Sequence, residues 1–224
     1  MAKPRVYVTV PNGRPWIHKN VVLALLRFQR DRRYDLRIAL PTNHPLEVNQ
    51  AHIVQDFMNG GEDYWLSIDA DNPPKKNPLD LIALDKDVIG LPTPVWHSVG
   101  KPGERPYYYN MYDFDAAEDG YREHKDMQGL QRVDAIGGGC FLMARRVFEN
   151  PRMRRQPFQR RYNRDGTIRR GNDLAFSERA RRNGVELWAH YGYPCEHHHE
   201  VELGEVIRAF AEMEEMEEME EMER

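Results

Sequence analysis

The chain has 224 residues, 40% of them hydrophobic and 30% charged, with a formal net charge of −4. That length fits one domain with a substantial buried core. No run of about 18 apolar residues occurs, which excludes a membrane-spanning helix, and no signal-peptide pattern precedes the first strand-like residues. Two cysteines cannot form a disulfide framework, so we expect a cytoplasmic protein.

Charge is distributed unevenly along the chain. Residues 200–224 contain 11 Glu and two Arg, and from residue 204 onward they form a Glu/Met repeat. We expect residues 1–203 to form the domain and residues 204–224 to be a helical or disordered tail. Within the domain, Arg145–Arg182 holds 13 Arg and four acidic residues, a net charge of +9. Such density favours a polyanionic partner, although charge runs more often form a solvated surface.

The first half of the chain alternates strand-like with helix-like segments. Runs rich in β-branched and aromatic residues predict strands at Val6–Val10, Leu36–Leu40, Tyr64–Ile68 and Val88–Leu91. Apolar residues at helical spacing predict helices over Pro15–Arg30, from Asn43 as N-cap and Pro45 as first-turn residue to Gly60-Gly61, and over Leu79–Leu84. This order predicts an α/β fold built on a mostly parallel sheet flanked by helices.

Three polar loops follow the first three predicted strands. They are Pro11–Arg14, Pro41–His44 and Asp69–Asn72. In parallel sheets, ligands bind beyond the carboxyl ends of the strands, where such loops meet. The sequence therefore predicts a binding site at this edge of the sheet.

The second half of the chain is less regular. Residues 92–131 are rich in Pro, Gly, Tyr and charge, which indicates a long excursion or lid, and residues 150–170 resemble an Arg-rich loop. Between them we expect strands at Val133–Ile136 and Cys140–Met143. A helix is expected from Gly171 to Asn183 with Gly184 as its C-cap, followed by a strand at Val185–Ala189.

The pair Asp69 and Asp71 is the sharpest local signal. Carboxylates two residues apart after a buried strand can share one hard divalent cation, manganese or magnesium, or one of them can hold a ribose hydroxyl. The alternative is an ordinary acidic turn before Pro73-Pro74. The position of the pair directly after Tyr64–Ile68 favours the cation.

Cys195-Glu196-His197-His198-His199 is the second candidate for metal binding. A neutral imidazole can supply a further ligand to the same cation. Neighbouring side chains of an extended segment point in opposite directions, so one histidine, or two at i and i+2 (His197 and His199), is the realistic number of donors. A separate zinc site with Cys195 and a solvated polar loop are the alternatives.

Asp173 is expected at the start of a helix, where the helix dipole favours the ionised carboxylate that a general base requires. Asp is also simply a good residue for a helix N-terminus. Gly137-Gly138-Gly139 matches no phosphate-binding fingerprint, but it permits close approach of a ligand or a packed strand.

In chain order, these segments resemble a family-2-like glycosyltransferase of the GT-A fold, over about residues 5–199. Asn49 lies in a segment similar to the family's Ala-Arg-Asn helix, without its Arg, and Tyr64–Pro74 resembles the strand leading into the D-x-D motif. Asp85–Pro92, Val133–Phe148 and Cys195-Glu196-His197 are similar to the following family segments. Gly171–Asn183 resembles the family's E-D-x-x-F-x-x-R-A segment, with Asn172 in place of the Glu.

The resemblance implies a metal-dependent, inverting sugar transfer from a nucleoside-diphosphate sugar, with a UDP-sugar favoured. Asp71 and His197 would hold manganese or magnesium, with Asp69 nearer the ribose or the metal, and Asp173 would be the base. The donor would contact residues from four segments, namely Pro11, Asn12, Gly13, Asn49, Asp69, Gly138 and Gly139.

The acceptor and the reaction class have alternatives. The basic segment and the tyrosines near Tyr108 favour DNA with a hydroxylated base, as in bacteriophage enzymes, but a saccharide or protein acceptor fits equally. A sugar-nucleotide nucleotidyltransferase of the pyrophosphorylase type shares this fold, but Pro11–Arg14 is a poor version of its Gly-rich loop. A non-catalytic nucleotide-binding or nucleic-acid-binding protein on the same scaffold is the third class.

Overall fold

The structure is a computed structural model that describes residues 3–13, 16–96, 107–200, 203–204 and 206–208. Most of the predicted acidic tail, residues 209–224, therefore lies outside the described residues. The same holds for Arg14 in the first predicted loop and for residues 97–106 of the predicted excursion.

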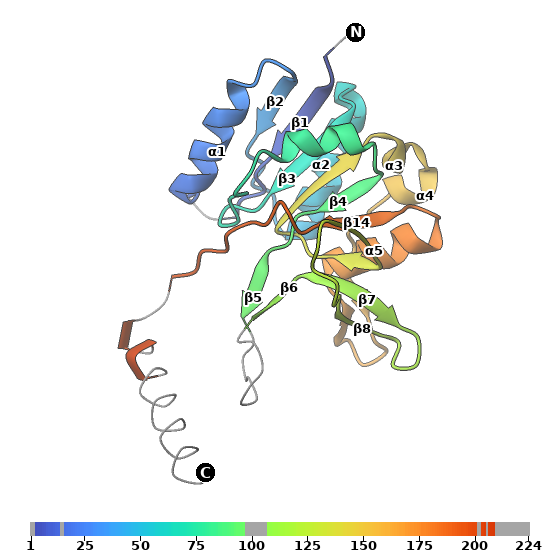
Figure 1. The fold of residues 1–224 in the computed structure, drawn as a ribbon. Helices are drawn as coiled ribbons and strands as arrows, with labels where there is room; N and C mark the ends of the chain where they lie inside the picture. Colours follow the sequence, from blue (N-terminus) through green and yellow to red (C-terminus); the bar gives the residue numbers. More distant parts are fainter. Residues whose placement is uncertain (1–2, 14–15, 97–106, 201–202, 205, 209–224) are drawn as a thin grey trace.

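A seven-stranded sheet forms the centre of the molecule (Figure 1). In spatial order its strands are β2 (Asp35–Ala39), β1 (Arg5–Thr9), β3 (Tyr64–Ile68), β11 (Cys140–Ala144), β4 (Val88–Gly90), β14 (Leu187–His190) and β9 (Leu130–Val133). β2, β1 and β3 are parallel, as are β4 and β14. β11 is antiparallel to both of its neighbours, and β9 is antiparallel to β14. The predicted mostly parallel α/β sheet is confirmed.

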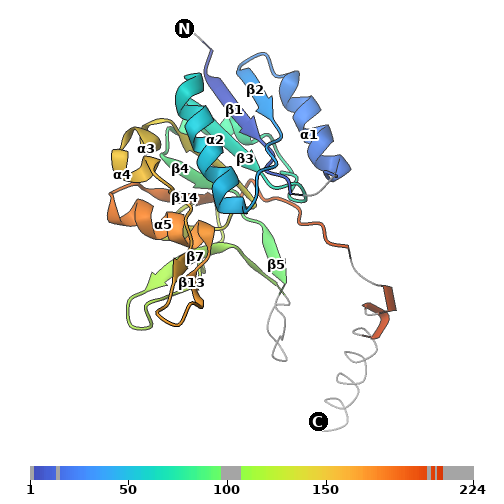
Figure 2. The same cartoon turned by 180° about the vertical axis from the view of Figure 1, so that it is seen from behind.

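Helices cover both faces of this sheet (Figures 1 and 2). α1 (Lys19–Gln29) and the 3-10 helix η1 (Pro78–Leu84) lie on one face, and α2 (Leu46–Gly60) and α5 (Asn172–Arg182) lie on the other. Successive strand residues point to opposite faces, so β1 places Val6 and Val8 in the core under α1 and Tyr7 in the core under α2. This two-sided burial explains the continuous apolar runs in the sequence.

Two predicted helix starts differ from the structure. α1 begins at Lys19, after the ring nitrogen Nδ1 of His18 accepts a hydrogen bond from the backbone N–H of Asn20 at 3.3 Å. α2 begins after Pro45, which is itself the N-cap, so the predicted cap at Asn43 is wrong. The side-chain amide of Asn43 instead faces that of Asn49 at 3.5 Å.

Short strands replace most of the predicted loops of the second half. β10 (Ala135–Ile136), β7 (Met111–Asp115) and β8 (Gly120–Glu123) form a second sheet, and β5 (Pro94–Trp96) pairs with β6 (Tyr107–Tyr109). The Arg-rich loop contains α3 (Arg146–Glu149), α4 (Pro151–Arg154), β12 (Arg161–Tyr162) and β13 (Ile168–Arg170). Segments of two to five residues are too short for a periodicity to predict. None of the described helices has the length and apolar character needed to cross a bilayer.

Candidate active site

A cleft of about 280 Å³ lies at the edge of the sheet where β1 and β3 end. Two loops and two apolar side chains line it, namely Pro11, Asn12, Gly13, Asp69, Ala70, Asp71, Trp16 and Leu46. The loop after β2 lies alongside, because the backbone N–H of Asn12 donates to the carbonyl oxygen of Pro41 at 3.0 Å. The predicted meeting of three loops at one edge is confirmed for their described residues.

Backbone hydrogen bonds from three other segments hold the loop Asp69-Ala70-Asp71. The N–H of Asp69 donates to the carbonyl oxygen of Gly139 at 2.8 Å, directly before β11. The N–H groups of His18 and His198 donate to the carbonyl oxygens of Ala70 and Asp71 at 2.9 and 3.0 Å. Because these bonds use backbone atoms, they fix the loop and leave the two carboxylates for a ligand.

The ionised form of the Asp69 carboxyl group is disfavoured in the folded protein. Burial raises its pKa well above the usual value, and the negative charges of Asp71 and Asp173 raise the pKa further. The predicted base and the predicted metal-binding loop lie in one site, although they are far apart in sequence, because Asp69 hydrogen-bonds to Gly139 and Asp173 to Gly138. A divalent cation at Asp69 would offset this repulsion, so the donor set fits such a group in charge.

His197 is oriented by a backbone carbonyl. Its Nδ1 lies 2.7 Å from the carbonyl oxygen of Pro94. A carbonyl only accepts, so Nδ1 carries the proton and Nε2 carries the lone pair that a metal ligand needs. In His198, by contrast, Nε2 contacts a carboxylate oxygen of Glu196 at 2.7 Å, and the ring stacks on His18. Of these two histidines, His197 is the better arranged for a cation.

Cys195 is a free cysteine in the core. It is buried against Cys140, and burial together with the hydrogen bond to Cys195 raises the pKa of the Cys140 thiol. The zinc site built on Cys195 stays an alternative prediction. Within the described ranges, no three His, Cys, Asp or Glu side chains converge as a metal site, so the predicted set Asp69, Asp71 and His197 needs side-chain rotation to close on an ion.

Asp173 lies in the first turn of α5, as predicted, and faces the segment before β11. Its Oδ2 accepts a hydrogen bond from the backbone N–H of Gly138 at 3.1 Å. Burial raises the pKa of Asp173, while backbone N–H donors and the charge of Arg160 act in the opposite direction. The result is a carboxylate of increased basicity in a fixed position, which suits a group that accepts a proton.

The three consecutive glycines, Gly137-Gly138-Gly139, differ in how closely their surroundings pack against them. A Cβ on Gly139 would lie 2.8 Å from Oγ1 of Thr93, and one on Gly137 would lie 2.3 Å from an asparagine amide, so both positions are closely packed against protein. A Cβ on Gly138 would meet nothing nearer than Oδ2 of Asp173 at 4.0 Å. Gly138 is therefore the least closely packed of the three glycines.

Two residues predicted to bind the sugar donor, Asn12 and Asn49, form hydrogen bonds to the backbone of the loops around the cleft. Asn12 and Asn49 are only 8% and 2% exposed, and their side-chain amides donate to the carbonyl oxygens of Trp16 at 3.1 Å and Pro41 at 2.9 Å. Both side chains thus shape the cleft wall. Gly13, at the end of the same wall, is exposed.

Trp16 is a site residue that the sequence analysis missed. It lines the cleft and is 38% exposed, an unusual position for a large aromatic side chain. The sequence analysis placed it inside a helix, which in the structure begins only at Lys19. The signal that could have found it is an aromatic residue close behind the polar Pro-Asn-Gly turn that follows the first strand.

Gln50 and Asn172 were also missed as a pair. The side-chain amide of Asn172 donates to Oε1 of Gln50 at 3.1 Å, which links α5 to α2 next to Asp173. This hydrogen bond holds the start of α5, which carries Asp173, against α2.

The arginines of Arg145–Arg182 are divided between internal and exposed positions. Arg145 donates to the carbonyl oxygens of residues 57, 58 and 62 and so closes the C-terminal end of α2. Five further arginines form ion pairs with acidic side chains, namely Arg146, Arg160, Arg169, Arg170 and Arg182. Six exposed arginines form no ion pair with any described residue. Arg154 donates to the carbonyl oxygen of Phe148 and Arg181 lies over the Phe114 ring. The other four are Arg152, Arg155, Arg161 and Arg164.

No family model matches the chain, and no curated protein matches it. Solved structures do match. A197 from STIV superimposes with a TM-score of 0.58 at 13% identity, over 88% of this chain and 86% of that one. GalNAc-T7, solved with UDP, GalNAc and Mn2+, superimposes with a TM-score of 0.54 at 14% identity. The match covers 89% of this chain and 44% of the GalNAc-T7 chain. The chain has a GT-A-like fold. At such low identity these likenesses establish the fold alone, and the family-2 assignment stays a prediction from the order of the motifs.

Proposed function

We propose that the protein is a glycosyltransferase that moves a sugar from a nucleoside-diphosphate sugar, with a UDP-sugar favoured, to an acceptor hydroxyl with inversion. The observation that carries this proposal is that Asp69 and Asp173 hydrogen-bond to the neighbouring residues Gly139 and Gly138, directly before β11. It joins a cleft for an anionic donor to a carboxylate that can accept a proton. The GT-A-like fold, found also in GalNAc-T7 with UDP, GalNAc and Mn2+, supports the proposal.

The donor nucleotide would occupy the cleft. Its base would stack on the exposed ring of Trp16, against the wall formed by Pro11–Gly13. Asp71 and His197 would hold manganese or magnesium, with Asp69 at the cation or at a ribose hydroxyl. When bound, the cation supplies positive charge to the diphosphate leaving group. The raised pKa of Asp69 and the orientation of the His197 ring support this assignment.

Asp173 would be the general base. Its carboxylate takes the proton from the acceptor hydroxyl while that oxygen bonds to the anomeric carbon and the bond to the nucleoside diphosphate breaks. The N–H of Gly138 holds Oδ2, and a glycine at this position places no side chain next to the carboxylate. Attack from the face opposite the leaving group produces the inverted configuration.

A hydroxylated base in DNA is the acceptor that the charge distribution favours. Arg152, Arg155, Arg161 and Arg164 are exposed on the segment that leads to α5 and Asp173, and in the described part of the chain they lack acidic partners. Binding through such a face releases counterions, so affinity for duplex DNA falls steeply with salt. A salt-independent affinity would leave a saccharide or protein hydroxyl as the acceptor.

A thermal-shift screen tests the reaction class. UDP, GDP and UDP-sugars are added with and without Mn2+ to the unaltered chain, to Asp71→Asn, and to Asp126→Asn as an exposed acidic control away from the cleft. We expect a nucleoside diphosphate to raise Tm only with Mn2+, and Asp71→Asn to lose the effect. Release of pyrophosphate from a nucleoside triphosphate and a sugar phosphate would instead identify a nucleotidyltransferase. Absence of any nucleotide effect would contradict both.

A further inference from the structure

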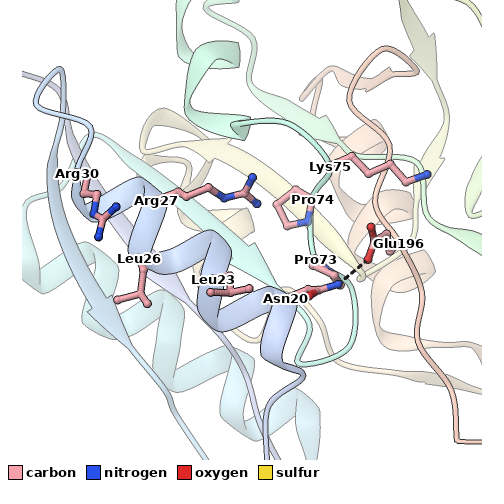
Figure 3. A pocket seen from close by; sticks show the side chains of 9 residues that line it. All are labelled: Asn20, Leu23, Leu26, Arg27, Arg30, Pro73, Pro74, Lys75 and Glu196. Atoms are coloured by element: carbon pink, nitrogen blue, oxygen red, sulfur yellow. Dashed lines mark hydrogen bonds between the residues drawn. The ribbon is translucent and has the colours of Figure 1, made fainter.

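A second hollow, of about 500 Å³, lies between α1 and the loop that follows Asp71 (Figure 3). One wall carries Leu23 and Leu26 of α1, and the other carries Pro73 and Pro74. The two leucines are 54% and 55% exposed. These leucines add exposed apolar surface to a hollow that two prolines also line, and exposed apolar surface of this kind favours contact with another segment.

Positive charge surrounds this apolar groove. Arg27, Arg30 and Lys75 line it together with a single acid, Glu196. Glu196 already contacts the amide of Asn20 at 3.2 Å and the ring of His198 at 2.7 Å. Arg27 and Arg30 form no ion pair with any residue that the structure describes, and Figure 3 shows Arg27 extending across the groove toward Pro74. The groove therefore fits an occupant that is both apolar and acidic.

The chain itself supplies such a segment. Residues 209–224 contain eight Glu, four Met and one Arg, with a Met after every second Glu from residue 213 onward. Methionine side chains are flexible and adapt to irregular apolar surfaces. The glutamates on both sides of each Met carry the charge opposite to that of the groove cations Arg27, Arg30 and Lys75.

The length of the connection allows this segment to reach the groove. Twelve residues separate Glu196, which lines the groove, from residue 209. Residues 203–204 and 206–208 of this connection are helical, so with the preceding residues extended the connection spans about 30 Å. The 11 residues of α1 are about 16 Å long. A tethered segment has an effective concentration in the millimolar range, so weak apolar and ionic contacts are enough for docking.

We propose that residues 209–224 dock in the groove of their own molecule, with Met side chains on Leu23 and Leu26 and Glu side chains on Arg27, Arg30 and Lys75. The groove wall includes Pro73 and Pro74, directly after Asp71, and Glu196, directly before His197. A docked tail would therefore contact, from outside the cleft, the segment that follows Asp71 and the segment that precedes His197. The inference does not depend on the proposed glycosyl transfer.

Carbodiimide cross-linking tests the docking on the full chain. This reagent joins a carboxylate to an amine only where the two are in contact, and trypsin releases residues 209–224 as one peptide because no Lys or internal Arg interrupts them. We expect cross-links from this peptide to Lys75 and none to Lys86, which lies over the Trp188 ring on another part of the molecule. Salt at 1 M should weaken them, since the Debye length falls to about 3 Å.

Variants of the groove separate docking from chance contact. Leu23→Glu with Leu26→Glu should reduce the Lys75 cross-link by about fivefold or more, while Leu84→Glu, an exposed leucine outside the groove, should leave it unchanged. An unchanged cross-link in the double variant would overturn the proposal. Cross-links between isotopically labelled and unlabelled molecules would overturn docking within one molecule and identify a second copy as the occupant. Binding to phosphatidylglycerol vesicles that needs both leucines, without the Lys75 cross-link, would identify a membrane as the occupant and also overturn the proposal.

Discussion

Replacement of Asp173 by Asn separates chemistry from binding. Asn keeps the shape of the side chain and an oxygen that can accept the N–H of Gly138, now 3.1 Å from Oδ2. It cannot accept the proton of an acceptor hydroxyl. Loss of a general base typically lowers the rate by about 10²–10⁴, which corresponds to about 3–5 kcal/mol in the activation free energy. Affinity for the nucleoside diphosphate should stay unchanged, because the cleft is built from other residues.

The same variant should be more stable than the unaltered protein at neutral pH. Burial raises the pKa of Asp173, so the folded state binds its proton more tightly than the unfolded state does. The unaltered protein therefore loses stability as pH rises from the ordinary pKa of 3.8 through the raised one, and this loss persists above it. Each pKa unit of the rise corresponds to about 1.4 kcal/mol. Asp173→Asn removes the penalty, and its advantage should disappear at pH 3.

Activity, nucleotide affinity and thermal stability of Asp173→Asn are measured beside a control variant. Sugar transfer and the calorimetric affinity for UDP with Mn2+ are compared between variants, and melting is followed from pH 3 to 7. Asp165→Asn is the control, because that exposed carboxylate accepts hydrogen bonds from Thr167 that lower its pKa. The control should keep its activity and gain no stability at neutral pH. Transfer that survives in Asp173→Asn, or that falls only as far as nucleotide binding falls, would refute the role of Asp173.

Further variants test the surrounding geometry. Gly138→Ala should fold normally and lose transfer. Gly139→Ala should lower Tm, because its Cβ would lie 2.8 Å from Oγ1 of Thr93. A lower Tm for Gly138→Ala than for Gly139→Ala would contradict the looser packing at Gly138. Asp69→Asn should raise Tm at pH 7 without metal and abolish stabilisation by Mn2+, because its raised pKa reflects an uncompensated charge; calorimetric melting with a metal titration measures both. Arg145→Ala removes hydrogen bonds to three carbonyl groups and should cost about 3 kcal/mol, which lowers Tm by about 6–12 °C without changing DNA affinity.

Local pattern was sufficient for the first half of the fold. The strands β1 to β4 and the helices between them lie within a few residues of their predicted positions, because long apolar runs and helical spacing are set by burial on both faces of one sheet. The errors occurred where packing overrides local preference. Asn43 is a favourable N-cap residue in isolation, yet Pro45 occupies that position, and the Asn43 amide turns toward Asn49.

The site was predictable in part. The strand-end position of Asp69 and Asp71 predicted the cleft, and the start of a helix predicted the place of Asp173. Trp16 was missed because the helix start was placed too early. The place of Cys195 was not predictable from residue types, since only the packed core reveals that it is buried against Cys140.

The sequence by itself determined the elements and the chemistry of single residues: a mostly parallel sheet, a carboxylate pair after its third strand, and an acidic tail after a basic body. Only the tertiary structure decided how these parts combine. The insertion of β11 between β3 and β4 brings Gly138, Asp69 and Asp173 together. The packing of α1 beside the loop with Pro73 and Pro74 creates a groove lined by apolar and cationic side chains. Such contacts depend on strand order and helix placement, which are set by long-range packing and leave no periodicity in the sequence.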